Sequence, residues 1–340
     1  MNLYDSNILE EIEKMNKKKL ILIIIIVLCI LGLVILLISN QQKRIEVLEL
    51  KVKKLDERTA GMTVTMIGGS NMKEKGDINS CGFVIRSKNG ELILVDSGRD
   101  VDAKIILKYI KTYGNGTVDH WFVTHAHSDH VGALLVLLEK EDITIENLYY
   151  SFNSLEWYKE HDLRGFETEE KMIKQLENSK IKNKIECQKN QEIEMDNINC
   201  EILRIANPEI TNSDNGNDSS MVFKMTATDV NKSIIFLGDA YKYTSIELLE
   251  NPEKLKADAV QMAHHGQNGV SKEVYQAIAP ELCFFNAPEW LYNNDNGTGY
   301  NTGKWQSIIV REWMKEVNAT NIVAYNGDRT IRFTKYGIEY

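Results

Sequence analysis

Residues 124–132 read THAHSDHVG and hold three of the chain's seven histidines together with one aspartate. They lie between an apolar strand-like run, WFV, and a helix-like run, ALLVLLE. Loops at strand ends often carry functional groups, and imidazole and carboxylate are usual ligands of zinc, manganese or iron. His125 and His127 can converge on one cation, and Asp129 and His130 on a second. The stretch therefore predicts a metal site; solvated histidines in a polar turn would not explain this crowding.

Three further segments place ligand-type side chains where strand-like runs end. Asp96 lies in LILVDSG, Asp239 in IIFLGDAY, and His264 and His265 in VQMAHHGQNG. A carboxylate at position 239 could bridge two cations, because each carboxylate oxygen offers lone pairs of its own. Each segment alone is weak evidence. Together with residues 124–132 they predict one site assembled from four strand ends.

Strand hairpins alternate with strand–helix units twice along residues 62–340. CGFVIRS and GELILVDSG form a hairpin pattern with a turn at 88–90, and MVFKMTAT with KSIIFLGDA forms another. Residues 103–114 predict a helix, residues 155–183 a long charged helical region, and residues 207–220 a polar loop. This order predicts an α/β fold of the αββα type, with two mixed sheets packed together and helices outside.

The first 61 residues differ from the rest of the chain. Residues 20–38 are uniformly apolar, and a helix of that length approaches the ~30 Å hydrocarbon core of a membrane. A cleaved signal peptide is the alternative, but the run is long for one and no A-x-A-like site follows. Lysines cluster within residues 14–19, just before the run. We expect a cytoplasmic arm over residues 1–19, a single transmembrane helix over residues 20–38, and an extracellular remainder.

Residues 39–61 predict a helical stalk ahead of a domain that spans residues 62–340. Four apolar residues of the stalk occupy heptad a and d positions: Ile45, Leu48, Val52 and Leu55. Two heptads are marginal on their own, so two alternatives remain. The stalk forms either a coiled coil that makes the protein a homodimer or a single amphipathic linker helix.

Charge and cysteine content exclude some classes of protein. The formal net charge of −9 argues against wholesale basic wrapping of nucleic acid, although a local basic patch is compatible with it. The five cysteines lie far apart and form no CxxC pair, so they indicate neither a cysteine zinc knuckle nor a disulfide framework.

The four segments together resemble the metallo-β-lactamase superfamily. THAHSDHVG matches the HxHxDH signature, VDSG the earlier aspartate motif, LGDA the bridging-aspartate motif, and HHG the last histidine motif. The resemblance covers residues 62–340. GDINSCGFVI, DSSMVF, FLGDA and AHHGQNG are most similar in style to the hydrolase domain of ComEC competence proteins.

The resemblance implies a metallo-β-lactamase sandwich and a role for each motif residue. His125 and His127 would bind one ion, Asp129 and His130 the other, and Asp239 would bridge them. The superfamily pattern favours His265 as the last ligand and leaves His264 to face substrate or donate a proton; the reverse assignment stays open. Asp96 would orient a ligand histidine. The cofactor would be a divalent metal, two Zn²⁺ or alternatively Mn²⁺.

The chain departs from the superfamily at one position. Many members carry another histidine ligand between the HxHxDH motif and the bridging aspartate, whereas only His161 lies in that interval here. His161 stands in a charged helical context and is expected at the surface. The ComEC-like group has an Asn/Ser segment instead, and Asn217, Ser219 and Ser220 occupy it here. These residues are candidate substrate contacts, and a mononuclear site is an alternative to a dinuclear one.

The favoured hypothesis is a membrane-anchored phosphodiesterase or nuclease that uses a metal-activated water. Asp129 or Asp239 would hold the water, and His264 would protonate the leaving group. The substrate would contain a phosphodiester, with DNA as one option. The alternatives are a lactonase or β-lactamase-type hydrolase and a non-catalytic metal-stabilised binding module.

The aromatic segment 284–306 follows the last metal motif. Its Trp290 and Tyr300 could stack on a base or a sugar ring of the substrate. A surface loop pinned by its own aromatic side chains is an equal alternative.

Overall fold

The computed structural model divides the chain into two compact units, Met1–Arg58 and Thr59–Tyr340. It describes residues 17, 19, 21–22, 24–45, 61–69, 79–211 and 215–340. The first unit contains a helix over Ile24–Ile45 that is long and apolar enough to cross a membrane. This helix continues past the predicted end of the span at residue 38. The predicted heptad positions beyond Ile45 lie outside the described residues.

The second unit contains two mixed β-sheets. Among the described residues, the first sheet has eight strands in the spatial order β15 (Gly337–Glu339), β14 (Arg329–Thr334), β1 (Met62–Met66), β2 (Gly82–Arg86), β3 (Leu92–Asp96), β4 (Thr117–Phe122), β5 (Thr144–Tyr150) and β6 (Ile181–Glu186). The second sheet has seven, in the order β13 (Thr320–Val323), β12 (Leu282–Phe285), β11 (Ala259–Gln261), β10 (Lys232–Phe236), β9 (Val222–Ala227), β8 (Ile198–Arg204) and β7 (Glu192–Met195).

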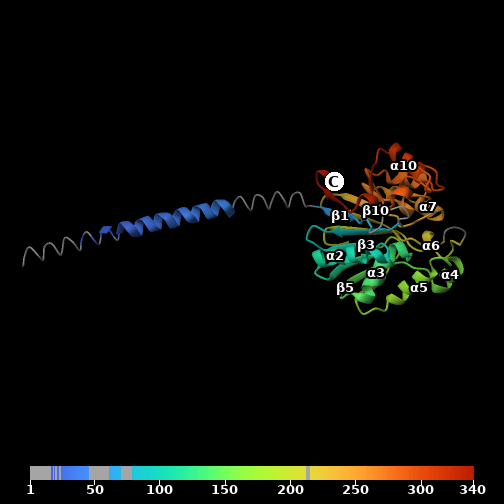
Figure 1. The fold of residues 1–340 in the computed structure, drawn as a ribbon, viewed down its shortest axis with the longest axis horizontal. Helices are drawn as coiled ribbons and strands as arrows, with labels where there is room; N and C mark the ends of the chain where they lie inside the picture. Colours follow the sequence, from blue (N-terminus) through green and yellow to red (C-terminus); the bar gives the residue numbers. More distant parts are fainter. Residues whose placement is uncertain are drawn as a thin grey trace, which may run out of the picture. The chain divides into compact units, whose positions relative to one another are not determined.

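Helices cover the outer face of each sheet (Figure 1). The first sheet is covered by α2 (Ala103–Gly114), α3 (Ser128–Lys140) and α5 (Phe166–Gln175), and the second by α7 (Lys242–Leu248), α8 (Lys272–Ile278) and α10 (Ser307–Glu316). The short helical elements are α4 (Leu155–His161), α6 (Asn215–Asp218), α9 (Glu289–Tyr292), η1 (Asp100–Asp102), η2 (Pro252–Leu255), η3 (Ala263–Gly266) and η4 (Ala324–Asn326). The predicted αββα sandwich is confirmed.

The central strands are apolar on both faces because both faces are covered. In β3, Ile93 and Val95 point into the core between the sheets, while Leu92 and Leu94 pack beneath the helices. Strands buried on two sides read as continuous apolar runs, which explains LILV. The inter-sheet core is rich in edge-to-face aromatic contacts, such as the one between Phe83 and Phe236 with ring centroids 5.2 Å apart.

Parallel pairing brings the four motif segments to the same ends of neighbouring strands. β3 and β4 are parallel, so Asp96 and the segment after β4 leave the first sheet at one edge. β10 and β11 are parallel, so Asp239 and the histidine turn leave the second sheet together. The backbone N–H of Met221 donates to the carbonyl of Thr124 at 2.7 Å, which joins the two sheets there.

Three local predictions were wrong. The helical region predicted over 155–183 is two helices, α4 and α5, followed by β6, because Gly165 interrupts the pattern. The predicted polar loop 207–220 contains the short helix α6. The helix predicted after the HxHxDH motif begins within it, at Ser128, so Asp129 and His130 occupy the first turn of α3.

Candidate metal centre

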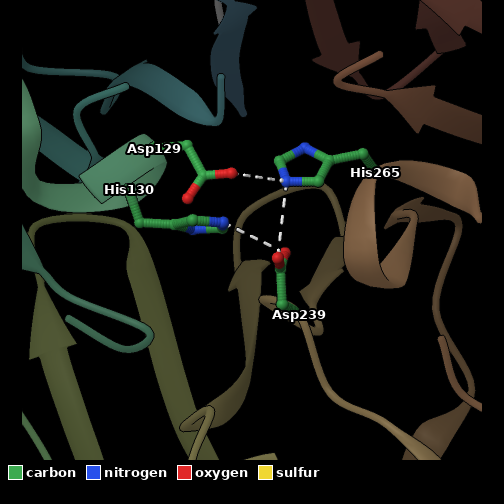
Figure 2. A group of neighbouring side chains, drawn as sticks. All are labelled: Asp129, His130, Asp239 and His265. Atoms are coloured by element: carbon green, nitrogen blue, oxygen red, sulfur yellow. Dashed lines mark ion pairs between the residues drawn. The ribbon is translucent and has the colours of Figure 1, made fainter. Parts of the chain in front are cut away.

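Four ligand-type side chains meet between the two sheets. Asp129 and His130 come from the first turn of α3, Asp239 follows β10, and His265 lies in η3 (Figure 2). Nε2 of His265 lies 3.2 Å from Asp129 and 3.4 Å from Asp239, and Nε2 of His130 lies 3.0 Å from Asp239. The ligand atoms of all four lie within 4.8 Å of one another, which suits one divalent cation.

His125 and His127 lie beside this cluster. The ring centroid of His125 is 4.6 Å from that of His127 and 4.2 Å from that of His130. The structure therefore brings together all six residues that the sequence proposed as metal ligands. It places Asp239 next to the rings of both His130 and His265, one of its oxygens facing each ring.

Two rings of the cluster are held through Nδ1. Nδ1 of His130 lies 2.8 Å from the Asp96 carboxylate, and Nδ1 of His265 lies 2.9 Å from the carbonyl of Asn286. Carboxylate and carbonyl oxygens only accept, so Nδ1 carries the proton in both rings and Nε2 can offer a lone pair to a cation. The predicted orienting role of Asp96 is compatible with this contact.

The other two rings follow the same rule with different partners. The Thr124 hydroxyl donates to Asp96 at 2.8 Å, so it accepts from Nδ1 of His125 at 3.2 Å and leaves Nε2 of His125 for a cation. Nε2 of His127 donates to Asp162 at 2.6 Å and leaves Nδ1 for a cation. Each of the four rings thus has one nitrogen bonded away from the centre.

Buried polar atoms without a hydrogen-bond partner mark the place where a cation fits. Among the described residues they include Nε2 of His125, His130 and His265, and Oδ1 of Asp239. Buried polar atoms nearly always have partners, so several such atoms in one spot call for an ion. The donor set of imidazole nitrogens and carboxylate oxygens matches zinc and manganese. The residues present therefore fit a divalent metal, as expected from the sequence.

Mutual charge interactions shift the pKa values within the cluster. Burial would lower the pKa of His265, but Asp239 and Asp129 raise it to about 9. Burial would likewise lower the pKa of His130, but Asp239 and Asp96 raise it well above the usual range. For Asp239, burial acts to raise the pKa, and the nearby imidazoles of His130 and His265 hold it well below normal. In His125, burial and the neighbouring histidines lower the pKa.

The histidine turn is built from left-handed backbone. His264 and His265 have φ values of 50° and 58°, a conformation that costs energy for residues other than glycine. It turns the two rings in different directions: His265 into the cluster and His264 toward its rim. Nε2 of His264 lies 4.0 Å from the Asp239 carboxylate, and Nδ2 of Asn217 lies 3.4 Å from the same Nε2. His264 thus lies at the partly exposed edge of the cluster.

Asp239 is held by its own supporting groups. Its backbone N–H donates to the Ser220 hydroxyl at 3.0 Å. The amide of Gln261 accepts from the N–H of Leu237 and Gly238 and donates to the carbonyl of Gly238. Ser220, a predicted substrate contact, is buried and positions Asp239 instead.

Asp162 is a site residue that the sequence analysis missed. It follows α4 and lies in hydrogen-bond contact with His127, with Glu169 of α5 beside it. Burial and the Asp162 charge raise the pKa of Glu169 to about 10, so Glu169 is protonated at neutral pH. The backbone of Gly216 in α6 lies so close to Asp162 and His127 that a Cβ atom at position 216 would overlap both of these side chains. The only signal for it in the sequence is the position of Asp162 directly after His161 in WYKEHDLRG.

The other predicted substrate residues have mixed placements. Asn217 is buried at the site, and its Oδ1 has no hydrogen-bond partner. Ser219 is buried and accepts from Asn153 at 3.0 Å, so it supports the loop. Trp290 packs on Trp305 with ring centroids 4.7 Å apart, as the self-pinned loop alternative expects.

Tyr300 and His161 lie outside the groups of side chains that could hold a metal ion. Tyr300 is exposed at 61%. The predicted surface position of His161 is partly right, since its side chain is 22% exposed and packs on Trp157 with ring centroids 5.1 Å apart. The 284–306 segment reaches the site at both ends: the Asn286 carbonyl meets Nδ1 of His265, and the N–H of Gln306 donates to Asn268 beside the histidine turn.

The family comparison agrees with the fold. Residues 76–151 match the model described as Metallo-beta-lactamase superfamily. The match runs through β2 to β5 and includes Asp96 and the whole segment 124–132. The two-sheet sandwich and this match show that the second unit has the metallo-β-lactamase fold. No curated protein matches the sequence significantly.

Solved structures with a similar fold are remote in sequence. The metallo-beta-lactamase fold protein YhfI from Bacillus subtilis is 15% identical, with a TM-score of 0.48 over 79% of this chain and 99% of that chain. Unliganded yeast PDE1 is 10% identical, with a TM-score of 0.48 over 80% and 99%. A diphosphatase from the PhnP family is 12% identical, with a TM-score of 0.41 over 70% and 92%.

Binding of metal should release protons at neutral pH. His130 and His265 have raised pKa values and carry an extra proton at pH 7 in the metal-free protein, whereas a ligand nitrogen must be deprotonated. We expect release of about two protons per protein at pH 7, measured by zinc calorimetry in buffers of different ionisation enthalpy. Apparent affinity should rise with pH up to about 9, where His265 loses its proton. Buffer-independent heats at pH 7 would contradict this account.

Asp162→Asn should weaken metal binding. The neutral amide keeps the shape but removes the carboxylate that makes His127 a stronger ligand, and such partners are worth roughly tenfold in affinity or more. Metal titration of the full chain measures the change. His161→Gln is the matched control, because His161 is the adjacent residue and packs on Trp157 instead. Equal affinities for the two variants would show that Asp162 does not support the ligand.

Proposed function

We propose that the protein is a metal-dependent hydrolase that cleaves phosphodiesters with a metal-activated water. One observation carries this proposal. The ligand atoms of Asp129, His130, Asp239 and His265 lie within 4.8 Å of one another, and the rings of His125 and His127 lie beside them, with the buried Nε2 of His125 left without a hydrogen-bond partner. Structural metal sites close around the ion, whereas this cluster has His264 at a partly exposed rim. An open rim is what a reacting substrate needs.

The ligands divide into two groups around Asp239. His125 and His127 would hold one cation, and Asp129, His130 and His265 the other, with Asp239 between them. Bound divalent cations lower the pKa of water and offset charge on the reacting oxygens. The protein's part is to hold its donors in place. The outward bonds from Asp96, Asp162 and the Asn286 carbonyl do this before any ligand arrives.

The residues at the rim would handle the substrate and the protons. The contacts of Asp129 with Asn79, Arg99 and His265 all use Oδ2. Its Oδ1 can therefore accept a hydrogen bond, and then a proton, from the attacking water, which points a lone pair of the water at phosphorus. His264 lies 4.0 Å from Asp239 and can donate a proton to the leaving oxygen. Asn217 offers its unpartnered Oδ1 to a hydroxyl or water in the same space. The bond from phosphorus to the leaving oxygen breaks as the water oxygen bonds to phosphorus.

Phosphodiesters are the favoured substrate class because the motif style resembles the ComEC hydrolase domain. An alkoxide leaving group also needs a proton donor such as His264. DNA is one candidate and a small phosphodiester is another. We further propose that the helix Ile24–Ile45 anchors the chain in a membrane with the hydrolase domain outside, and that the stalk pairs two chains.

Hydrolysis should depend on the metal ligands. Protein loaded with Zn²⁺ or Mn²⁺ is expected to cleave bis(p-nitrophenyl) phosphate, and EDTA should abolish the reaction. His127→Ala and Asp239→Asn should reduce turnover to the background rate, because each removes a ligand donor. Release of p-nitrophenol is the measurement. Metal-loaded protein that cleaves neutral esters or lactones but no phosphodiester would point to the lactonase alternative and overturn the proposal.

His264→Gln should affect poor leaving groups most. A general acid contributes roughly 10²–10⁴-fold when the leaving oxygen is basic and much less when it leaves readily. We expect kcat for a thymidine dinucleotide to fall by about that factor, while kcat for bis(p-nitrophenyl) phosphate changes far less. Metal content serves as the control, because His265 and not His264 belongs to the ligand cluster. Equal losses for both substrates would assign His264 to metal binding.

A further inference from the structure

One arginine stands beside the metal ligands and has no role in the mechanism described so far. Arg99 follows Gly98 just after β3, and its side chain is 22% exposed. Its Nη2 lies 3.7 Å from Oδ2 of Asp129, beyond hydrogen-bonding distance. Nε2 of His265 lies 3.2 Å from the same oxygen. The guanidinium is therefore a fixed positive charge next to the cluster.

The backbone of Arg99 is mounted rigidly. Its N–H donates to the buried carboxylate of Asp102 at 3.0 Å, and the Ser80 hydroxyl donates to the same carboxylate at 2.6 Å. α3 packs directly on this backbone: a Cβ atom at Gly132 would lie 2.9 Å from the Arg99 Cα. Asp129 is carried by that same helix. Packing therefore fixes the backbone of Arg99 relative to the helix that carries Asp129.

The guanidinium is also oriented, yet it keeps donors to spare. Nε donates to the Asn79 carbonyl at 2.7 Å, Nη2 to the Asn79 side chain at 3.1 Å, and Nη1 to Ser128 at 3.2 Å. An arginine has five N–H groups, so within the described residues one remains on each of Nη1 and Nη2. A guanidinium held in place loses little entropy when it binds an oxyanion.

Neutralising Asp129 does not account for this arrangement. Asn79 already donates to Oδ2 of Asp129, and a bound cation would balance the carboxylate. Four carboxylates lie at or directly behind the proposed ligands, those of Asp129, Asp239, Asp96 and Asp162, so their charge would balance two divalent cations without Arg99. An added guanidinium makes the loaded site net positive and so favours the entry of an anion. A neutral ester would gain nothing from it.

We propose that Arg99 binds a non-bridging phosphate oxygen of an anionic substrate and sets the preference for phosphodiesters over neutral esters. This inference rests on the proposed function and names the residue that selects its substrate class. Asn79 and Ser128 hold the guanidinium plane, and the two remaining N–H groups meet the oxyanion. Arg99 is a binding residue that leaves the bond-breaking step to the groups around Asp239.

The test compares an anionic with a neutral substrate in the metal-loaded full chain. Arg99→Met should raise KM for bis(p-nitrophenyl) phosphate roughly ten- to a hundredfold, the worth of a charge-assisted hydrogen bond, with kcat nearly unchanged. Neither parameter for p-nitrophenyl acetate should change by more than about twofold. Arg99→Lys should fall in between, because lysine keeps the charge without the planar fork. Arg332→Met is the matched control, since Arg332 pairs with Glu339 on β14 and β15.

A second measurement does not need turnover. Inorganic phosphate should raise the melting temperature of the metal-loaded protein, and Arg99→Met should lose that increment while Arg332→Met keeps it. Equal loss of kcat on both substrates, or loss of metal from Arg99→Met and Arg99→Lys, would show that Arg99 only orients Asp129 and would overturn the inference. If the unchanged protein cleaves no phosphodiester, the proposed function fails. The rise in melting temperature with phosphate then tests the role of Arg99 by itself, and a rise that Arg99→Met retains refutes that role.

Discussion

The metal centre depends on one constraint: each ligand imidazole is bonded on its outer nitrogen, so that its inner nitrogen points at the other ligands and is available to a cation. His130 bonds outward to Asp96, and His265 bonds outward to a backbone carbonyl. Burial of several polar groups together is costly, and a bound cation would offset that cost by satisfying them at once. The left-handed backbone at His264 and His265 belongs to the same account, because it aims a ligand at a stated cost in local strain.

The two-sheet architecture follows from what that cluster requires. No single sheet edge supplies all the ligands: Asp129 and His130 come from the helix after β4, and Asp239 and His265 follow strands of the second sheet. The apolar core between the sheets therefore sets the distances across the site. The hydrogen bond from Met221 to the Thr124 carbonyl joins the sheets right beside the first histidine. A change that loosens the core between the sheets therefore also changes the distances between the proposed ligands.

Sequence alone predicted the sandwich, and it picked out residues that the fold brings together, because both follow from local pattern. Apolar runs define buried strands, and Asp239 or His265 is conspicuous at a strand end. The sequence did not identify Asp162 and Arg99 as site residues because no local pattern distinguishes them. Asp162 meets His127 through the packing of α4 and α5. For Trp290 the sequence left two alternatives, stacking on substrate or packing within its own loop. The contact with Trp305 favours packing within the loop, and only the tertiary structure shows that contact.

The supporting bonds follow one pattern at the two proposed cation positions. Each proposed cation faces one imidazole backed by a carboxylate and one backed by a neutral group: His130 with Asp96 beside His265, and His127 with Asp162 beside His125. A carboxylate behind an imidazole makes the ring a stronger donor. The half that lacks a third histidine is the half where Asp162 lies, with a second acid, Glu169, protonated beside it. The protonated Glu169 adds no second negative charge, so the Asp162 carboxylate alone faces His127 as the acceptor that orients this ring.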